Sequence, residues 1–243
     1  MLRLITLAIV AMLAVSAQAQ LALQNGNFDA DPSLGDADDP VNSPTGWFQH
    51  YTQEGSWSDF RFGSAGRGGW TANAISLGQN FDPDPGPEDG YYYTRLGAYG
   101  GELSARVNGF GYNRSDRANP AGDFVVSVYS TPAGSFTGAN GADVAGAGRL
   151  LGTTTVDIDD LTGLTPQSRA FQLDVPLSAA GLTRGDELWL HIGDGPDDAN
   201  LETLDEPMID NLTLTVVVPE PAGVALAAVF SAAALARRRR RAA

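Results

Sequence analysis

The sequence predicts an all-β protein whose central part is a single β-sandwich. Three observations predict this class: apolar residues recur at every second position, the intervening segments are rich in Gly, Pro and Asp, and no long helical pattern is present. Successive side chains of a strand point to opposite faces, so alternation with a period of two is typical of half-buried strands. In "FQLDVP", Phe171, Leu173 and Val175 share one face, and polar residues occupy the other.

Ten segments carry this pattern. In "ELWLHI" the two leucines and the isoleucine share one face, and Trp189 and His191 lie on the opposite face. In "PLSAAGLTRGD", Ser178 is expected to cap a single helical turn that ends before Gly185. In chain order the predicted strands cover residues 47–51, 57–62, 72–77, 91–96, 103–107, 124–129, 150–158, 171–175, 187–192 and 210–217.

The segment from residue 21 to residue 218 is strongly acidic. It contains 9 arginines and 28 acidic residues, a net charge of −19, and the whole chain has no lysine. A surface of this charge repels polyphosphates, which excludes nucleic acid as a partner. It also suits loosely bound divalent cations, although a saline habitat or a genome that favours arginine explains the composition equally well. Because cysteine is absent, disulfide bonds play no part in the stability.

The first 19 residues are typical of a secretory signal peptide. Arg3 provides the positive charge, residues 4–15 form the apolar region, and Ala17-Gln18-Ala19 provides the small residues of a cleavage site. The sequence therefore predicts export, with residues 1–19 as the signal peptide and residues 20–218 as the β-sandwich domain.

The C-terminal end combines an apolar segment with a cluster of arginines. Residues 222–236 would form a helix of roughly 22 Å, which is too short for a hydrocarbon core of about 30 Å. Half of the segment is alanine, so its apolar residues contribute only about 2 kcal/mol to insertion. The arginines at the end of the chain would stay on the cytoplasmic side of a membrane. The tail therefore predicts transient contact with the inner membrane, not a permanent anchor.

This order of parts resembles the PEP-CTERM sorting signal of Gram-negative bacteria. The resemblance implies recognition by an exosortase, cleavage near the Pro-Glu-Pro motif, and delivery to the cell surface or the extracellular polysaccharide matrix. It assigns residues 219–243 to the sorting signal. The residues that match the motif are Pro219, Glu220, Pro221, Arg237, Arg238, Arg239, Arg240 and Arg241.

The central domain resembles the galactose-binding-like jelly rolls of carbohydrate-binding modules. The resemblance is carried by "LQNGNFD" near the start, "PTGWFQHY" after it, and "IDNLTLTV" at the end. It implies a jelly roll in which Trp47 packs inside. It also implies a structural Ca²⁺ ion held by Asp29 and Asp210. The alternation places the carboxylate of Asp210 toward the interior, where a hydrogen bond to a turn or an ion pair with an arginine would serve equally well. Calcium requires six to eight oxygen ligands, so two carboxylates alone do not make a site.

Aromatic residues are the strongest functional lead, because sugar rings stack their C–H faces on flat aromatic rings. Trp57 and Trp70 lie next to Gly and Ser in loop-like contexts and are the preferred exposed candidates, together with Tyr92. In a strand Tyr92 points away from Tyr91 and Tyr93, so at least one of these faces belongs to the core.

Nothing in the sequence selects a catalytic group. The two histidines, His50 and His191, are far apart in the sequence and each belongs to a strand pattern. We therefore expect an exported, non-catalytic protein that associates with the cell surface or with exopolysaccharide and binds glycan. A structural matrix protein bridged by calcium and a secreted glycan-active enzyme are the alternatives.

Overall fold

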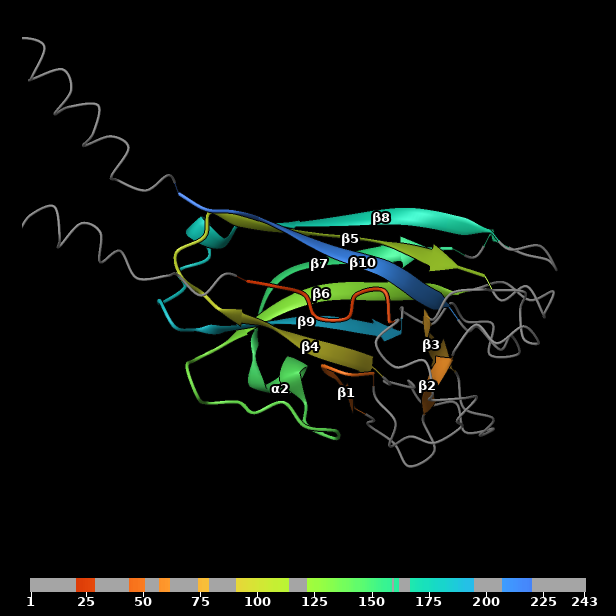
Figure 1. Ribbon diagram of the computed structural model, residues 1–243, viewed down its shortest axis with the longest axis horizontal. Helices are drawn as coiled ribbons and strands as arrows, with labels where there is room; N and C mark the ends of the chain where they lie inside the picture. The colour runs from red at the N-terminus through yellow and green to blue at the C-terminus, as the bar shows by residue number, and fades with distance from the viewer. Residues whose placement is uncertain are drawn as a thin grey trace, which may run out of the picture.

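The described residues form ten strands in two antiparallel five-stranded sheets, as seen in a computed structural model (Figure 1). The structure describes residues 21–28, 44–50, 57–61, 74–78, 91–113, 122–158, 160–161, 167–194 and 207–219. The strands are β1 (Trp47–His50), β2 (Trp57–Arg61), β3 (Ala74–Gly78), β4 (Tyr91–Ala98), β5 (Ser104–Tyr112), β6 (Asp123–Thr131), β7 (Arg149–Asp157), β8 (Ser168–Val175), β9 (Glu187–Asp194) and β10 (Met208–Val217). The helical turns are α2 (Val144–Ala147) and η1 (Leu177–Ala179).

The two sheets pack face to face as a sandwich. The first sheet, sheet A, has the order β1-β4-β9-β6-β7, and sheet B has the order β2-β3-β10-β5-β8. Every neighbouring pair is antiparallel, and most hydrogen-bonded neighbours are distant in sequence. This arrangement confirms the predicted all-β jelly-roll sandwich.

The core lies between the sheets and follows the predicted alternation. Phe171, Leu173 and Val175 of β8 are buried, whereas the residues between them are exposed. On β9 the two leucines and Ile192 are completely buried in the same cluster. Trp47 is 3 % exposed and packs inside, as predicted.

The N-terminal segment closes one side of the sandwich by bonding to both sheets. The amide of Ala22 donates to the carbonyl of Leu96 on β4, and the amide of Leu212 on β10 donates to the carbonyl of Gly26, each at 2.8 Å. This segment, red in Figure 1, runs across the opening between the layers. It also contacts β1, because Nε1 of Trp47 donates to the carbonyl of Gln24 at 3.2 Å.

Two local predictions were wrong. Ser178 does not cap a helical turn: it lies inside η1, whose first flanking residue is Pro176 and which has no side-chain cap. The Gly-rich segment between β6 and β7, for which the sequence predicts no helix, contains the helical turn α2, capped by Asp143 through the amide of Gly146. A short polar residue with an acceptor oxygen favours such a start, but a single turn produces no helical periodicity in the sequence.

The two ends of the chain lie largely outside the described residues. Pro219 is exposed after β10. The signal peptide, Glu220, Pro221 and the five arginines of residues 237–241 lie outside the described residues, so their assignments stay predictions. Among the described residues no helix is long and apolar enough to cross a membrane.

Candidate functional site

The outer face of sheet A is covered with aromatic side chains. The strand register places Phe48 beside Tyr93 and Tyr93 beside His191, and it places Trp189 beside Arg95. These residues alternate with the core residues of the same strands, so β4 and β9 bury side chains on both faces. Tyr91, Tyr93 and Trp189 form a second buried cluster, separate from the main core.

A segment that we call the strap, residues 132–148, covers this outer face. The Tyr93 hydroxyl donates to the carbonyl of Ala139 at 2.6 Å and accepts from its amide at 3.1 Å. The amide of Gly141 donates to the carbonyl of Gln49 on the edge strand β1 at 2.8 Å. Figure 1 shows the strap and α2, in green, outside β4 and β1. The strap therefore shields the aromatic cluster and occupies part of the edge of sheet A.

Asp143 fastens the strap to β4. The Tyr91 hydroxyl donates to its Oδ1 at 2.6 Å, and the same oxygen accepts from the amide of Gly146 at 2.8 Å. Burial acts to raise the pKa of Asp143, but the hydrogen bonds from Tyr91 and Gly146 outweigh it, and the pKa is lowered. Burial, together with the Asp143 carboxylate, raises the pKa of Tyr91. The carboxylate is therefore ionised and the phenol protonated at neutral pH.

Both histidines pack against Tyr91. The ring centroid of Tyr91 lies 4.1 Å from that of His191 and 4.8 Å from that of His50, which is nearly parallel to it. Burial lowers the pKa of His191 to about 4, and the nearby Asp143 carboxylate only partly offsets this effect. His191 is therefore neutral at pH 7. His191 is buried and packs against the rings of Tyr91 and Tyr129.

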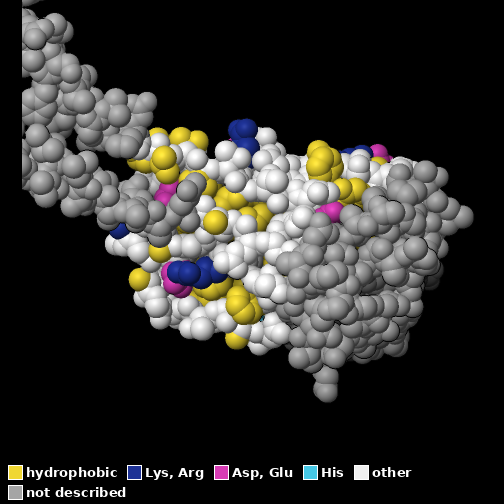
Figure 2. All heavy atoms as spheres, viewed as in Figure 1, with side chains coloured by type: hydrophobic (Ala, Val, Ile, Leu, Met, Phe, Trp, Pro, Cys, Tyr) yellow, Lys and Arg dark blue, Asp and Glu magenta, His cyan; other side chains and the backbone are white. Residues whose placement is uncertain are grey.

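A pocket opens where the strap meets β4, β9 and the N-terminal segment. Its volume is about 480 Å³, within the range of small-ligand sites. Apart from a guanidinium and an amide, the side chains that line it are apolar. Figure 2 shows a basic and an acidic side chain in contact on this part of the face, next to hydrophobic surface. The lining residues are Ala22, Gln24, Gly46, Phe48, Arg95, Leu96, Gly97, Ala98, Gly138 and Trp189.

A β-bulge in β4 shapes the pocket. Arg95 is paired with Trp189 and Gly97 with Leu188, so Leu96 is an extra residue that turns into the core. Gly97 has a φ of 131°, a backbone conformation that side chains larger than glycine rarely adopt. Bulges of this kind change the direction of a neighbouring side chain and are frequent beside functional sites. Here the bulge leaves Arg95 on the outer face, at the pocket.

The strap contributes a close backbone contact to the pocket. A Cβ atom at Gly138 would lie 2.5 Å from the Phe48 ring, so only glycine allows this approach. Phe48 packs in turn on Tyr93, with ring centroids 5.3 Å apart. The indole of Trp189 is fixed by a hydrogen bond from Nε1 to the hydroxyl of Thr131 at 3.0 Å. The aromatic part of the pocket is therefore held rigidly.

Arg95 is the charged group of the pocket. Its Nη2 lies 2.9 Å from Oε1 of Glu187, the first residue of β9. The Arg95 side chain is 48 % exposed, whereas that of Glu187 is 17 % exposed. The guanidinium can therefore reach a ligand while one of its N–H groups stays bonded to the carboxylate.

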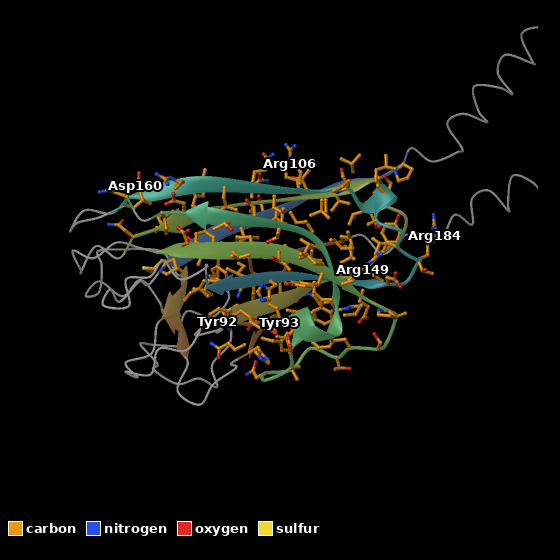
Figure 3. All side chains as sticks on the ribbon, turned by 180° about the vertical axis from the view of Figure 1, so that it is seen from behind. Tyr92, Tyr93, Arg106, Arg149, Asp160 and Arg184 are labelled. Atoms are coloured by element: carbon orange, nitrogen blue, oxygen red, sulfur yellow. The ribbon has the colours of Figure 1, made fainter. Side chains whose placement is uncertain are left out.

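The structure contradicts one predicted ligand-binding residue. Tyr92 is completely buried, and its hydroxyl accepts a hydrogen bond from Nε2 of Gln49 at 2.5 Å. Figure 3 shows Tyr92 and Tyr93 on adjacent positions of β4. Because its ring fills the core between the sheets, Tyr92 is not available for stacking on a sugar. Trp70 and the side chain of Trp57 lie outside the described residues, so both stay predictions.

The predicted calcium ligands are described only in part. Asp210 is buried, as the alternation predicts, and its carboxylate accepts from the amide and from Nδ2 of Asn211, at 2.5 and 3.0 Å. Asp29 lies outside the described residues. Within the described part of the chain no group of three or more His, Cys, Asp or Glu side chains is arranged to hold a metal. Asp210 supplies one buried carboxylate, which is too little to define a calcium site.

The pocket residues were not predicted as a group. Arg95 shares the face of Tyr91 and Tyr93 in "YYYTRLG", so parity alone could have placed it beside an aromatic face. The pairing of β4 with β9, which brings Trp189 next to Arg95, joins residues 94 positions apart. No local pattern in the sequence predicts that contact.

Comparison with known proteins supports the fold. No family model matches the chain, and no curated protein sequence matches it. Among solved structures, a cyclase from Fischerella sp. TAU in complex with 4-(1H-indol-3-yl)butan-2-one has a TM-score of 0.51 at 11 % identity. The match covers 84 % of this chain and all of that chain. At this identity the likeness shows a common sandwich fold and nothing about the reaction.

Two further structures are similar at lower scores. The K3 cleaved adhesin domain of Lys-gingipain from Porphyromonas gingivalis has a TM-score of 0.42 at 14 % identity, over 75 % of this chain and 98 % of that chain. The family 11 carbohydrate-binding module from Clostridium thermocellum, in complex with a mixed-linked tetrasaccharide, has a TM-score of 0.42 at 10 % identity, over 84 % of this chain and 100 % of that chain. Since both scores are below 0.5, neither supports an inference about the function of this chain.

Proposed function

We propose that the chain is an exported, non-catalytic protein of the cell surface or the exopolysaccharide matrix, and that the pocket beside β4 and β9 binds glycan. The signal-like N-terminus and the sorting-like tail support export, transient contact with the inner membrane and processing by an exosortase-type enzyme. The acidic composition supports a polysaccharide partner over a nucleic acid.

The pocket lined by Phe48 and Arg95 carries the glycan part of the proposal, and the buried indole of Trp189 supports it from below. Sugar sites combine apolar ring surface, which covers C–H groups, with a few polar groups that fix the hydroxyls. The guanidinium of Arg95 and the side chain of Gln24 provide such polar groups. Three of the lining residues are glycines, which have no side chain, so a sugar ring can approach the backbone.

Replacing Arg95 tests this proposal. We expect Arg95→Gln to weaken binding to the matrix polysaccharide of the producing cells by about tenfold or more, because a hydrogen bond from a charged donor contributes about 1.5–3 kcal/mol. Affinity electrophoresis or calorimetry with the full chain measures the change.

Arg106→Gln is the matched control. Arg106 also pairs with an acid, since its Nε lies 2.6 Å from Oδ1 of Asp174, and its side chain is 49 % exposed. It lies on the outer face of sheet B, away from the pocket (Figure 3). Its replacement should leave affinity within about twofold. An equal loss of affinity in both variants, or no loss of affinity in Arg95→Gln, would contradict glycan binding at this pocket.

The catalytic alternative lacks a comparable observation. Among the groups with shifted pKa values, Tyr91 belongs to the cluster that the strap covers, and Asp143 and His191 contact it. Their hydrogen bonds and ring contacts hold the strap on the sheet, which favours a packing role. The non-catalytic assignment and the calcium-bridged alternative both stay predictions.

A further inference from the structure

We infer that the pocket selects neutral sugars with adjacent hydroxyl groups over acidic sugars, and that Glu187 determines this selectivity. The inference rests on the proposed glycan-binding function. It names the class of glycan that the site would accept.

The first step concerns the donors that Arg95 can offer. A guanidinium carries five N–H donors and binds a free carboxylate through two of them in parallel. In the structure one donor, on Nη2, is bonded to Oε1 of Glu187, and among the described residues Arg95 has no other ion-pair or hydrogen-bond partner. Several N–H groups are therefore available to the hydroxyl oxygens of a sugar without displacing Glu187.

The second step concerns the charge that an acidic sugar would meet. The carboxylate of a uronic acid would compete with Glu187 for the same guanidinium and would lie close to its negative charge. Like charges that share one site are strongly unfavourable in a partly buried setting. The net charge of −14 on the whole chain adds a repulsion of the same sign at long range. A neutral sugar avoids both effects.

The third step concerns the acceptor that Glu187 contributes. Its Oε1 accepts a hydrogen bond from Arg95, and within the described part of the chain no second group bonds to its carboxylate. A donor and an acceptor side by side match two neighbouring hydroxyls, each of which can donate and accept. Glu187 does not line the pocket itself, but its carboxylate is bonded to Arg95, which does, so it lies next to any group that Arg95 binds. Glu187 therefore both positions Arg95 and excludes anions.

The test compares neutral polysaccharides with their oxidised forms. Soluble glucan, galactan and mannan, and the same polymers oxidised at C6 to uronates, are titrated into the full chain. We expect at least one neutral polymer to bind about tenfold more tightly than its oxidised form. In Glu187→Gln, which keeps a carbonyl acceptor for Arg95 but removes the charge, we expect this ratio to fall to about one or to reverse.

Asp174→Asn is the matched control, because Asp174 holds Arg106 on sheet B as Glu187 holds Arg95. It should leave the ratio as in the original chain. Stronger binding of the oxidised polymers by the original chain, or an unchanged ratio in Glu187→Gln, would overturn the selectivity while glycan binding stands. A chain that binds none of the six polymers would overturn the selectivity and contradict the proposed function as well.

Discussion

Replacing Trp189 by alanine is expected to lower the free energy of unfolding by about 3–5 kcal/mol and to weaken glycan binding, because the buried indole supports the pocket. The indole is 2 % exposed and contacts the rings of Tyr93 and Phe136, with centroids 5.9 and 5.0 Å apart. Its removal leaves a cavity between the outer face of sheet A and the strap. It also leaves the Thr131 hydroxyl without its donor. Urea denaturation measures the change in stability.

Hydrogen exchange shows whether the strap is the part of the fold that Trp189→Ala destabilises. The amides of Ala139 and Gly141, which bond to Tyr93 and Gln49, should lose protection in Trp189→Ala before the strands do. Phe110→Ala is the control, because Phe110 is an aromatic residue on β5 that is 40 % exposed. Its truncation should change the stability by less than about 1 kcal/mol. If Trp189→Ala lowers the free energy of unfolding by no more than this control does, the aromatic cluster does not hold the strap.

Acidification from pH 7 to pH 4 is expected to remove about 3 kcal/mol of the stability that depends on His191. The pKa of this histidine is about 4 in the folded chain, because of burial, and about 6.5 when unfolded. Between these values the unfolded chain binds a proton that the folded chain does not, so stability falls as the pH falls. Above about pH 6.5 both states are neutral at this site, and the effect disappears.

Asp143 also makes the free energy of unfolding fall with pH, because its pKa is lowered in the folded chain. Its contribution to stability is present above its unfolded pKa of 3.8 and is lost as the pH falls further. Many other carboxylates titrate near this range, so the measurement is the difference in unfolding free energy between the original chain and His191→Phe. This replacement keeps a flat ring against Tyr91 and Tyr129 and removes the titration. The difference should change by about 3 kcal/mol between pH 7 and pH 4 in favour of the variant. A difference that is independent of pH would show that His191 does not titrate as an isolated buried group.

Local alternation predicted the strands and one face of the core. It assigned the correct interior residues to β8 and β9, because the two-residue period of a strand fixes which side chains share a face. Strand ends were less well predicted: β5 extends to Tyr112, beyond the predicted end at residue 107, where glycines interrupt the apolar pattern. Gly109 and Gly111 lie there because the rings of Phe171 and Phe124 fill the space that their side chains would occupy.

The prediction that Tyr92 is an exposed ligand-binding residue was wrong for a physical reason. In "YYYTRLG" both faces of the strand carry tyrosine, and a tyrosine in a core and a tyrosine in a sugar site look the same in sequence. The hydrogen bond from Gln49, a residue on a different strand, satisfies the Tyr92 hydroxyl inside the core. Only tertiary pairing reveals such a partner.

The pocket depends on the same kind of long-range contact. The strap is a Gly-rich segment that resembles an ordinary surface loop in sequence, yet Gly138 lies directly on Phe48 and Ala139 bonds to Tyr93. Neither contact follows from local propensity, because the loop is held by side chains more than 40 positions away in the sequence.

An NMR titration of the full chain tests the central claim, glycan binding at the pocket, most directly. Short oligomers of a neutral polysaccharide that binds the chain are added stepwise. The chemical shifts of the backbone amides, the tryptophan indole N–H groups and the arginine Nε–H groups are followed. We expect the largest shifts at Phe48, Arg95, Gly97, Gly138 and the Trp189 indole. Shifts confined to Trp57 and Trp70, or to the outer face of sheet B around Phe110, with no change at Arg95 and Trp189, would contradict the proposed site.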